Sequence, residues 1–310
     1  MLTVLQTALE VGLIYGLVAL ALFISFSILN IADLSTDGCF TLGCAVGAML
    51  TIAGHPILAL FAAMAAGMLS GYVTAFLQTR LGVESILAGI ISNTGLYTIN
   101  LAVMGFSSNV SITGVDTVFS LFKGLVGGQW SRLILLALIA AVLVLVLIRF
   151  FGTSLGLSIR ATGDSLDMVS ASSINPKATI TIGLCLANAL TALSGCLIGE
   201  YNKFCDINLG TGMVTIALAS LIIGEVFAGH RGGVGKRIVC VVLGSIVYRF
   251  IIALALRLNI SAEYFKLVSA VIVAVAIAAP NMKGYVRLAK IKSNARKLRA
   301  LSGKGDETDA

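Results

Sequence analysis

The chain has 310 residues, of which 58% are hydrophobic and only 11% are charged. One soluble core cannot bury that much apolar surface, so these values exclude an ordinary soluble domain and indicate a protein that faces lipid. The net charge of +7 does not call for a nucleic-acid partner, because its obvious source is a basic C-terminal segment.

Apolar stretches recur along the chain at the length that a membrane requires. A bilayer core of about 30 Å is crossed by about 20 apolar helical residues, and only helices suit the pattern seen here. We therefore expect an all-α, polytopic transmembrane helix bundle of about nine spans within residues 1–282. The expected spans are Leu9–Leu29, Cys39–Ala53, Ile57–Thr79, Ser85–Met104, Arg132–Phe150, Thr179–Gly199, Thr211–Ala228, Ile238–Leu256 and Phe265–Pro280.

The distribution of Lys and Arg predicts an orientation. If residues 151–177 are cytoplasmic, alternation places most cations on the inner side, together with the basic tail 283–310. The N-terminus is then outside and the C-terminus cytoplasmic. The tail is expected to lie on anionic lipid headgroups, with a regulatory or ATPase partner as the alternative ligand. The first residues carry no cation, which argues against a signal peptide.

The chain offers no expected metal, cofactor or catalytic site. Its six cysteines lack a C-x-x-C spacing, and its two histidines stand alone. A glycine-rich segment at 229–237 resembles a phosphate-binding loop, but His230 and Arg237 occupy positions where that motif needs Gly and Ser or Thr. ATP hydrolysis is therefore expected in a separate subunit. Glycines spaced by four, such as Gly43 with Gly47 and Gly195 with Gly199, predict close helix packing.

Residues 151–177 form the most informative polar segment. Gly163 and Asp164 offer a helix start, residues 165–172 can form a short amphipathic helix, and Asn175–Pro176 ends it. Such a helix could transmit force from a separate ATPase. An ordinary interfacial connector is the alternative.

This segment resembles the cytoplasmic loop of ABC permeases of the branched-chain amino acid and ribose type, where a stretch like LGLSIRATGDS leads into the coupling helix. LNIADLSTDGCFTLGCAVGAML, from Leu29 to Leu50, and GMVTIALASLIIGE, from Gly212 to Glu225, are most similar to the branch linked to tryptophan and tyrosine uptake. The resemblance extends from about Gly12 to Pro280. The ending at Ser172–Pro176 departs from the family pattern and leaves the seat of the ATPase contact open.

The resemblance implies a partner set and a function. The partners are a cytoplasmic ABC ATPase dimer, an extracytoplasmic solute-binding protein and a second permease copy in the bacterial inner membrane. The implied function is the translocation of a small solute, an aromatic or branched-chain amino acid. The residues that the resemblance assigns to ATPase coupling are Arg160, Gly163, Asp164 and Met168.

Ionisable residues within or beside apolar runs are candidates for the solute pathway. The break around Asp33 and Asp37 either emerges at the cytoplasmic face, as plain alternation favours, or lines a wet part of the pathway. Arg249 falls deep in a span and should meet an acid, backbone carbonyls or water. Glu225 is the nearest acid by span order, and Glu200 is an outer alternative. Arg249 either forms a buried pair that fixes the helices or lines the pathway and attracts the solute carboxylate. The candidate pathway residues are Asn30, Asp33, Asp37, Glu225 and Arg249.

An ATP-independent channel or a secondary transporter is the alternative function. Paired inverted halves, or several intramembrane acids that form an ion route, would favour it. No convincing internal repeat is visible in the sequence.

Overall fold

The computed structural model describes residues 2–128, 130–229 and 232–257, with isolated positions 267, 270, 271 and 274 beyond them. The expected ninth span and the basic tail 283–310 lie outside the continuous described ranges.

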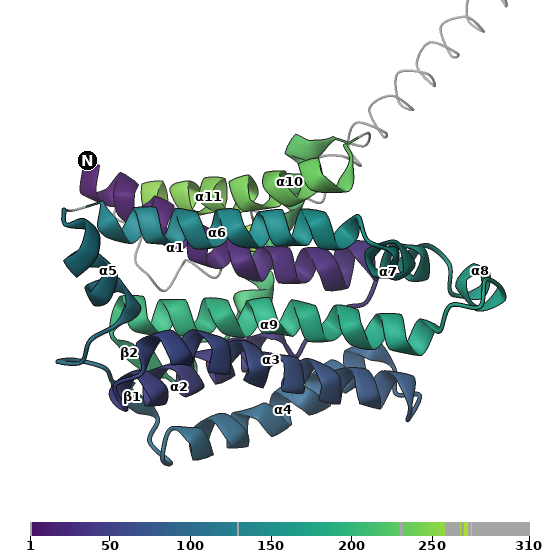
Figure 1. Ribbon diagram of the computed structural model, residues 1–310, viewed down its shortest axis with the longest axis horizontal. Helices are drawn as coiled ribbons and strands as arrows, with labels where there is room; N and C mark the ends of the chain where they lie inside the picture. The colour runs from purple at the N-terminus through teal and green to yellow at the C-terminus, as the bar shows by residue number, and fades with distance from the viewer. Residues whose placement is uncertain are drawn as a thin grey trace, which may run out of the picture.

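The described chain is almost entirely helical, which confirms the all-α class (Figure 1). Its elements are α1 (Leu2–Leu22), the π-helix η1 (Phe23–Ile28), α2 (Thr36–Ile52), α3 (Pro56–Thr79), α4 (Ser85–Val103), β1 (Asn109–Ser111), α5 (Val118–Val126), α6 (Ser131–Phe151), α7 (Ser154–Asp164), α8 (Leu166–Ala171), α9 (Pro176–Asn202), β2 (Phe204–Asp206), α10 (Met213–Ala228) and α11 (Val234–Arg257).

Six helices in the described part of the chain are long and apolar enough to cross a membrane. They are α1 continued by η1, α3, α4, α6, α9 and α11. The segments expected at Cys39–Ala53 and Thr211–Ala228 are also helical, but α2 and α10 are shorter apolar helices. The length of an apolar run therefore predicted where helices occur, whereas the count of nine spans is not confirmed.

The two short helices belong to two triplets that run in opposite directions, α1–α2–α3 and α9–α10–α11. Helix α2 packs on α3 and runs parallel to α9. In the second triplet, α10 packs on α11. Helices α1 and α10 both run antiparallel to α11, so α10 lies parallel to α1. Helices α3 and α9 pack against each other antiparallel. Their counterparts in the other triplet, α11 and α1, do the same. The described fold thus contains the inverted arrangement that the sequence did not reveal.

Glycine allows the central helices to approach closely. A Cβ added at Gly43 would lie 1.9 Å from the carbonyl oxygen of Ala192, and one at Gly195 would lie 1.9 Å from that of Phe40. No larger residue fits either position without separating α2 from α9. The predicted role of the four-residue glycine spacing in close packing is confirmed here.

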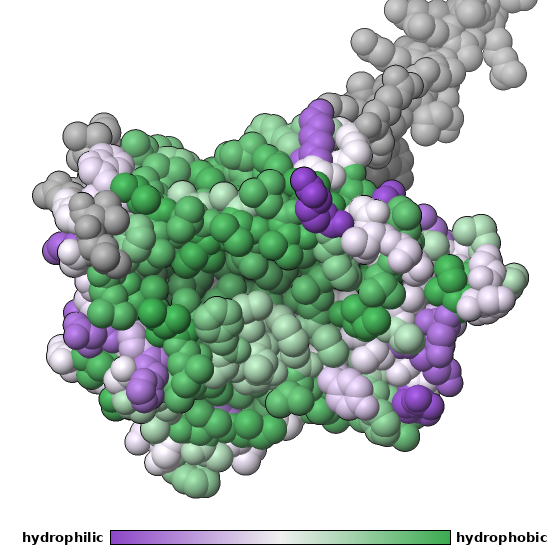
Figure 2. Space-filling view, in the orientation of Figure 1, coloured by the Kyte–Doolittle hydropathy of each residue, from purple (hydrophilic) through white to green (hydrophobic). Residues whose placement is uncertain are grey.

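Different elements close the two ends of the bundle (Figure 1). At one end, hereafter the strand end, β1 pairs antiparallel with β2 so that Val110 lies opposite Cys205. The short helices α7 and α8 lie at the other, the α8 end. Between the ends the visible face is mostly hydrophobic, and polar residues gather toward the ends (Figure 2). Exposed apolar side chains such as Phe61 on α3 and Leu145 on α6 are suited to lipid contact.

Candidate solute pathway and coupling region

The chain reverses direction directly after η1. Asn30 adopts a left-handed conformation with φ of 56°, and the Ile31 amide donates a hydrogen bond of 2.8 Å to the Ser25 carbonyl. This bond is one residue longer than the 6→1 bond that closes an α-helix when glycine or asparagine follows its end, because η1 is a π-helix. Asn30 is exposed, so its clearest role is to end η1 and return the chain toward the bundle interior.

Asp33 lies in that interior and is only 3% exposed. Its Oδ1 accepts hydrogen bonds from the Ser35 amide (2.9 Å) and hydroxyl (2.6 Å), and its Oδ2 accepts one of 2.9 Å from Asn188 Nδ2. Asn188 occupies the middle of α9, so Asp33 is buried near half depth. This position differs from the emergence at a membrane face that plain alternation favours.

Asp37 joins the starts of the two short helices. From the first turn of α2, its carboxylate accepts hydrogen bonds of 2.9 Å from the amides of Gly212 and Val214, at the start of α10. Gly210 donates its amide to the Thr41 hydroxyl at 3.1 Å, which fastens the same loop to α2. The first amides of a helix have no partner within it, and a carboxylate satisfies them well. Asp37 therefore stabilises a helix start that lies inside the bundle.

A pocket of about 130 Å³ opens where these two helix starts meet. Asn100 of α4 is 1% exposed, and its Nδ2 donates a 3.0 Å hydrogen bond to the Gly38 carbonyl while its Oδ1 accepts none. The lining is mostly polar. It comprises Asp37, Gly38, Thr41, Asn93, Tyr97, Asn100, Ile207, Asn208 and Thr211.

Arg249 does not pair with Glu225, so the pairing inferred from span order was wrong. Its guanidinium carbon lies 3.9 Å from the centre of the Tyr15 ring, and its Nε has no hydrogen-bond partner. The attraction of a cation to an aromatic face partly compensates for the burial of the charge. The helix register explains the error, because Arg249 faces α1 at the level of Gly12.

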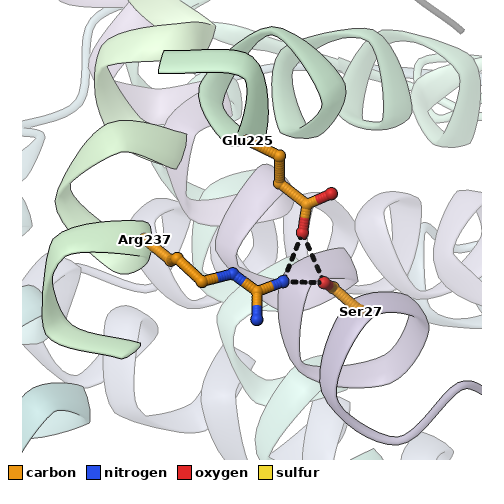
Figure 3. Close-up of polar contacts among 3 residues, drawn as sticks. All are labelled: Ser27, Glu225 and Arg237. Atoms are coloured by element: carbon orange, nitrogen blue, oxygen red, sulfur yellow. Dashed lines mark hydrogen bonds and ion pairs between the residues drawn. The ribbon is translucent and has the colours of Figure 1, made fainter. Parts of the chain in front are cut away.

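Glu225 pairs instead with Arg237, toward the α8 end (Figure 3). Nη2 of Arg237 lies 2.6 Å from Oε1 of Glu225 and 2.6 Å from the Ser27 hydroxyl, which also donates to Glu225. The three residues come from η1, α10 and α11. Both charged side chains are about a third exposed, at 31% and 35%. This cluster fastens both triplets to each other beside the π-helix.

The predicted coupling segment contains two helices. The predicted helix over residues 165–172 is present as α8, but Gly163 and Asp164 end α7 where a helix start was expected. Gly163 packs against η1, since an added Cβ would lie 1.8 Å from the Ile28 carbonyl oxygen. Asp164 and Met168 are exposed and Arg160 is partly exposed. Their contact with an ATPase stays a prediction.

Several polar residues of this interior were missed from the sequence. Asn100, Asn188 and Thr41 carry no charge, so a search for intramembrane ionisable groups passes over them. Their signal was an amide or hydroxyl within an otherwise apolar helix, which usually finds a partner across a helix interface. In the part of the chain that the structure describes, no cluster of three His, Cys, Asp or Glu side chains could hold a metal ion.

The fold, with its apolar helices, buried polar breaks and helical loop at one end, is that of a multi-pass membrane protein. Residues 4–277 match the family model described as "Branched-chain amino acid transport system / permease component", so the chain belongs to this family of transport components.

Two similar proteins are consistent with this assignment. The chain is 32% identical over 272 residues to a tyrosine transport system permease protein of Clostridioides difficile (strain R20291), covering 87% of this chain and 89% of that one. It is 31% identical over 277 residues to an uncharacterised protein of Rickettsia prowazekii (strain Madrid E), covering 88% and 96%. No solved structure matches the chain.

Proposed function

We propose that this chain is the membrane-spanning permease subunit of a bacterial ABC importer that takes up an amino acid, most simply an aromatic one. A separate ATPase dimer drives transport, an extracytoplasmic protein delivers the solute, and two copies of the permease form the path in the inner membrane. The family match over residues 4–277 carries the proposal, and the tyrosine permease relative directs the choice of solute.

The α8 end provides a surface suited to the ATPase. The short helices α7 and α8 lie there, and α8 projects beyond the long helices (Figure 1). Asp164 and Met168 present side chains to the outside. Gly163 lets α7 lie directly on η1, so a push on these helices would reach the break that contains Asp33. The N-terminus outside and the C-terminus inside would place this end in the cytoplasm.

The interior residues form the proposed pathway. Asp33 and Asp37 are buried or partly buried near half depth, and Arg249 stands over Tyr15 between α1 and α11. Ionisable groups at such depth are costly in lipid and mark solute or ion routes. Asn30 and Glu225 would support the pathway without lining it. Asn30 ends η1, and Glu225 forms an ion pair with Arg237.

The inverted triplets favour a second candidate, a secondary transporter. Many secondary carriers are built from inverted repeats with broken helices at the midplane, which α2 and α10 resemble. The two functions differ in their energy source, so the energy source decides between them.

Reconstitution in liposomes tests both. The permease, its genome-neighbour ATPase and its binding protein are combined with radiolabelled tyrosine, and uptake is measured with ATP, with a non-hydrolysable ATP analogue, or with an imposed proton or sodium gradient. We expect uptake only with hydrolysable ATP and all three components. Uptake by the permease alone under an ion gradient would contradict the importer and support the secondary transporter.

A further inference from the structure

We propose that the pocket between α2, α4 and the start of α10 binds the ammonium group of the transported solute, with Asp37 and Asn100 as its acceptors. This inference rests on the proposed function for the identity of the solute. It adds the chemical class that the site selects, a primary amine.

Asp37 gives the pocket a carboxylate that no cationic side chain of the described residues pairs with. Among the described residues the one ion pair joins Arg237 and Glu225, so Asp37 has no cationic side chain beside it there. Each of its two oxygens accepts one backbone amide from the start of α10. A carboxylate offers about four acceptor sites, so capacity remains for a further donor. A cation in the pocket would satisfy it.

Asn100 adds a second acceptor to the pocket, its side-chain oxygen Oδ1, which accepts no hydrogen bond. Its amide orientation is fixed, because Nδ2 must face the Gly38 carbonyl to donate the 3.0 Å bond. Oδ1 is then the free acceptor, and it is buried without a partner. A buried amide oxygen without a hydrogen bond is destabilising. The pocket that Asn100 lines offers a place for the missing donor, and an ammonium group has three N–H bonds to share.

The size of the pocket fits the head of an amino acid. The pocket volume of about 130 Å³ is well above the minimum that a single water needs. This is room for an ammonium group with its neighbouring carbon and carboxylate. Amide and hydroxyl donors of Asn93, Asn208 and Thr211 line the same space and suit the carboxylate. The side chain of the solute would then extend past Tyr97, which is 52% exposed.

Thiol labelling of the purified permease tests the charge of the pocket. Thr211→Cys places a reporter on the exposed rim, in a background where the partly exposed Cys185 is replaced by Ser; the other five cysteines are buried. We compare the reaction rates of a trimethylammonium-ethyl and a sulfonatoethyl methanethiosulfonate, each divided by its rate with free cysteine. We expect the cationic reagent to be favoured by about tenfold, and Asp37→Asn to remove most of this preference.

The matched control is the same substitution outside the pocket. Thr113→Cys lies exposed near β1 and does not line the pocket. Its ratio of cationic to anionic rates should not respond to Asp37→Asn. If Asp37→Asn changed the ratio of cationic to anionic rates equally at Thr211→Cys and Thr113→Cys, the preference would come from the overall charge of the protein. That result would overturn the proposal.

Protection of the Thr211→Cys reporter identifies the group that is bound, and it needs no change at Asp37, which also stabilises α10. Tyramine and tyrosine should slow labelling by the cationic reagent, whereas 3-(4-hydroxyphenyl)propanoate, which lacks the amine, should not. Asn100→Leu should weaken protection, and Ser92→Ala, which removes a buried hydroxyl of α4 outside the pocket, should leave it unchanged.

The result separates this inference from the proposed function. Labelling requires neither the ATPase nor the binding protein, so the reconstituted importer could take up tyrosine with ATP while its pocket shows no charge preference. Equal protection by the propanoate, or no preference for the cationic reagent, would overturn amine recognition and leave the importer intact. Protection by tyramine that is lost with Asn100→Leu would support it.

Discussion

Gly163→Ala is the sharpest perturbation of the proposed coupling path. An added Cβ at this position would lie 1.8 Å from the carbonyl oxygen of Ile28, 2.8 Å from its carbonyl carbon and 3.0 Å from Cα of Leu29. All three are backbone atoms, so no side-chain rotation relieves the contact. Real Cβ atoms are essentially never found within 3.0 Å of such atoms, so α7 must move from η1 by at least about 1.2 Å, the difference between 3.0 and 1.8 Å.

Two consequences of that displacement can be measured. Overpacking of a tight contact costs about 1–3 kcal/mol, so we expect a lower unfolding temperature in detergent. Helix α7 also carries Arg160 and leads into α8, so its shift should weaken the transmission of ATP hydrolysis to η1. The expected result is an ATPase that still hydrolyses ATP when the binding protein is added, with more ATP consumed per tyrosine imported than in the wild type.

Gly152→Ala is the matched control. Gly152 ends α6 just before the same helix, and its added Cβ would lie 3.4 Å from the Arg149 carbonyl oxygen, an ordinary contact. This variant should keep both the unfolding temperature and the ratio of ATP to solute. If Gly163→Ala matched Gly152→Ala in both measurements, α7 would not be the rigid link between the ATPase and η1.

Further predictions concern the helix contacts and the two arginines. Gly195→Ala should lower the free energy of unfolding by about 1–3 kcal/mol, whereas Gly95→Ala, which meets no atom within 4 Å, should not; equal stabilities would contradict the packing. Arg237→Gln should cost about 1–2 kcal/mol because it leaves the Glu225 carboxylate without its cation. Glu225→Gln added to that variant should cost little more, and additive losses in the double-mutant cycle would rule out their coupling. Arg249→Gln should give a folded permease with reduced tyrosine uptake, to be measured in liposomes, and unchanged uptake would remove it from the pathway.

The positions of the long helices could be predicted because lipid imposes a local rule. A run of about 20 apolar residues without charge forms a helix wherever it occurs, since the backbone has no other way to bond in hydrocarbon. Helices α3, α9 and α11 accordingly begin or end within a few residues of the expected spans. The turn at Gly54–Pro56 was also predictable, because glycine with φ of 88° and proline at the first helical position follow local rules.

Partners of buried polar groups could not be predicted, because they depend on helix register and on contacts distant in sequence. Asp33 bonds Asn188, 155 residues away, and Asp37 bonds the start of α10, 175 residues away. Arg249 and Arg237 lie on one helix, and span order alone named Glu225 as the nearest acid to Arg249. Glu225 lies at the level of Arg237, and Arg249 is about 18 Å further along α11, too far to reach it.

Inverted packing explains why two carboxylates stand in an otherwise apolar run. A helix that starts inside a bundle exposes amides with neither water nor a preceding turn to bond them. Asp33 bonds the Ser35 amide just before α2, and Asp37 bonds the amides of Gly212 and Val214 at α10. Each acid thus permits the start of one of the two shorter apolar helices. The Asp33 carboxylate accepts three hydrogen bonds, from Ser35 and Asn188, and is absent from the lining of the pocket between α2, α4 and α10. The Asp37 carboxylate accepts two hydrogen bonds and lines that pocket. The acid that builds the break in the second triplet is therefore also the one that remains available to a solute.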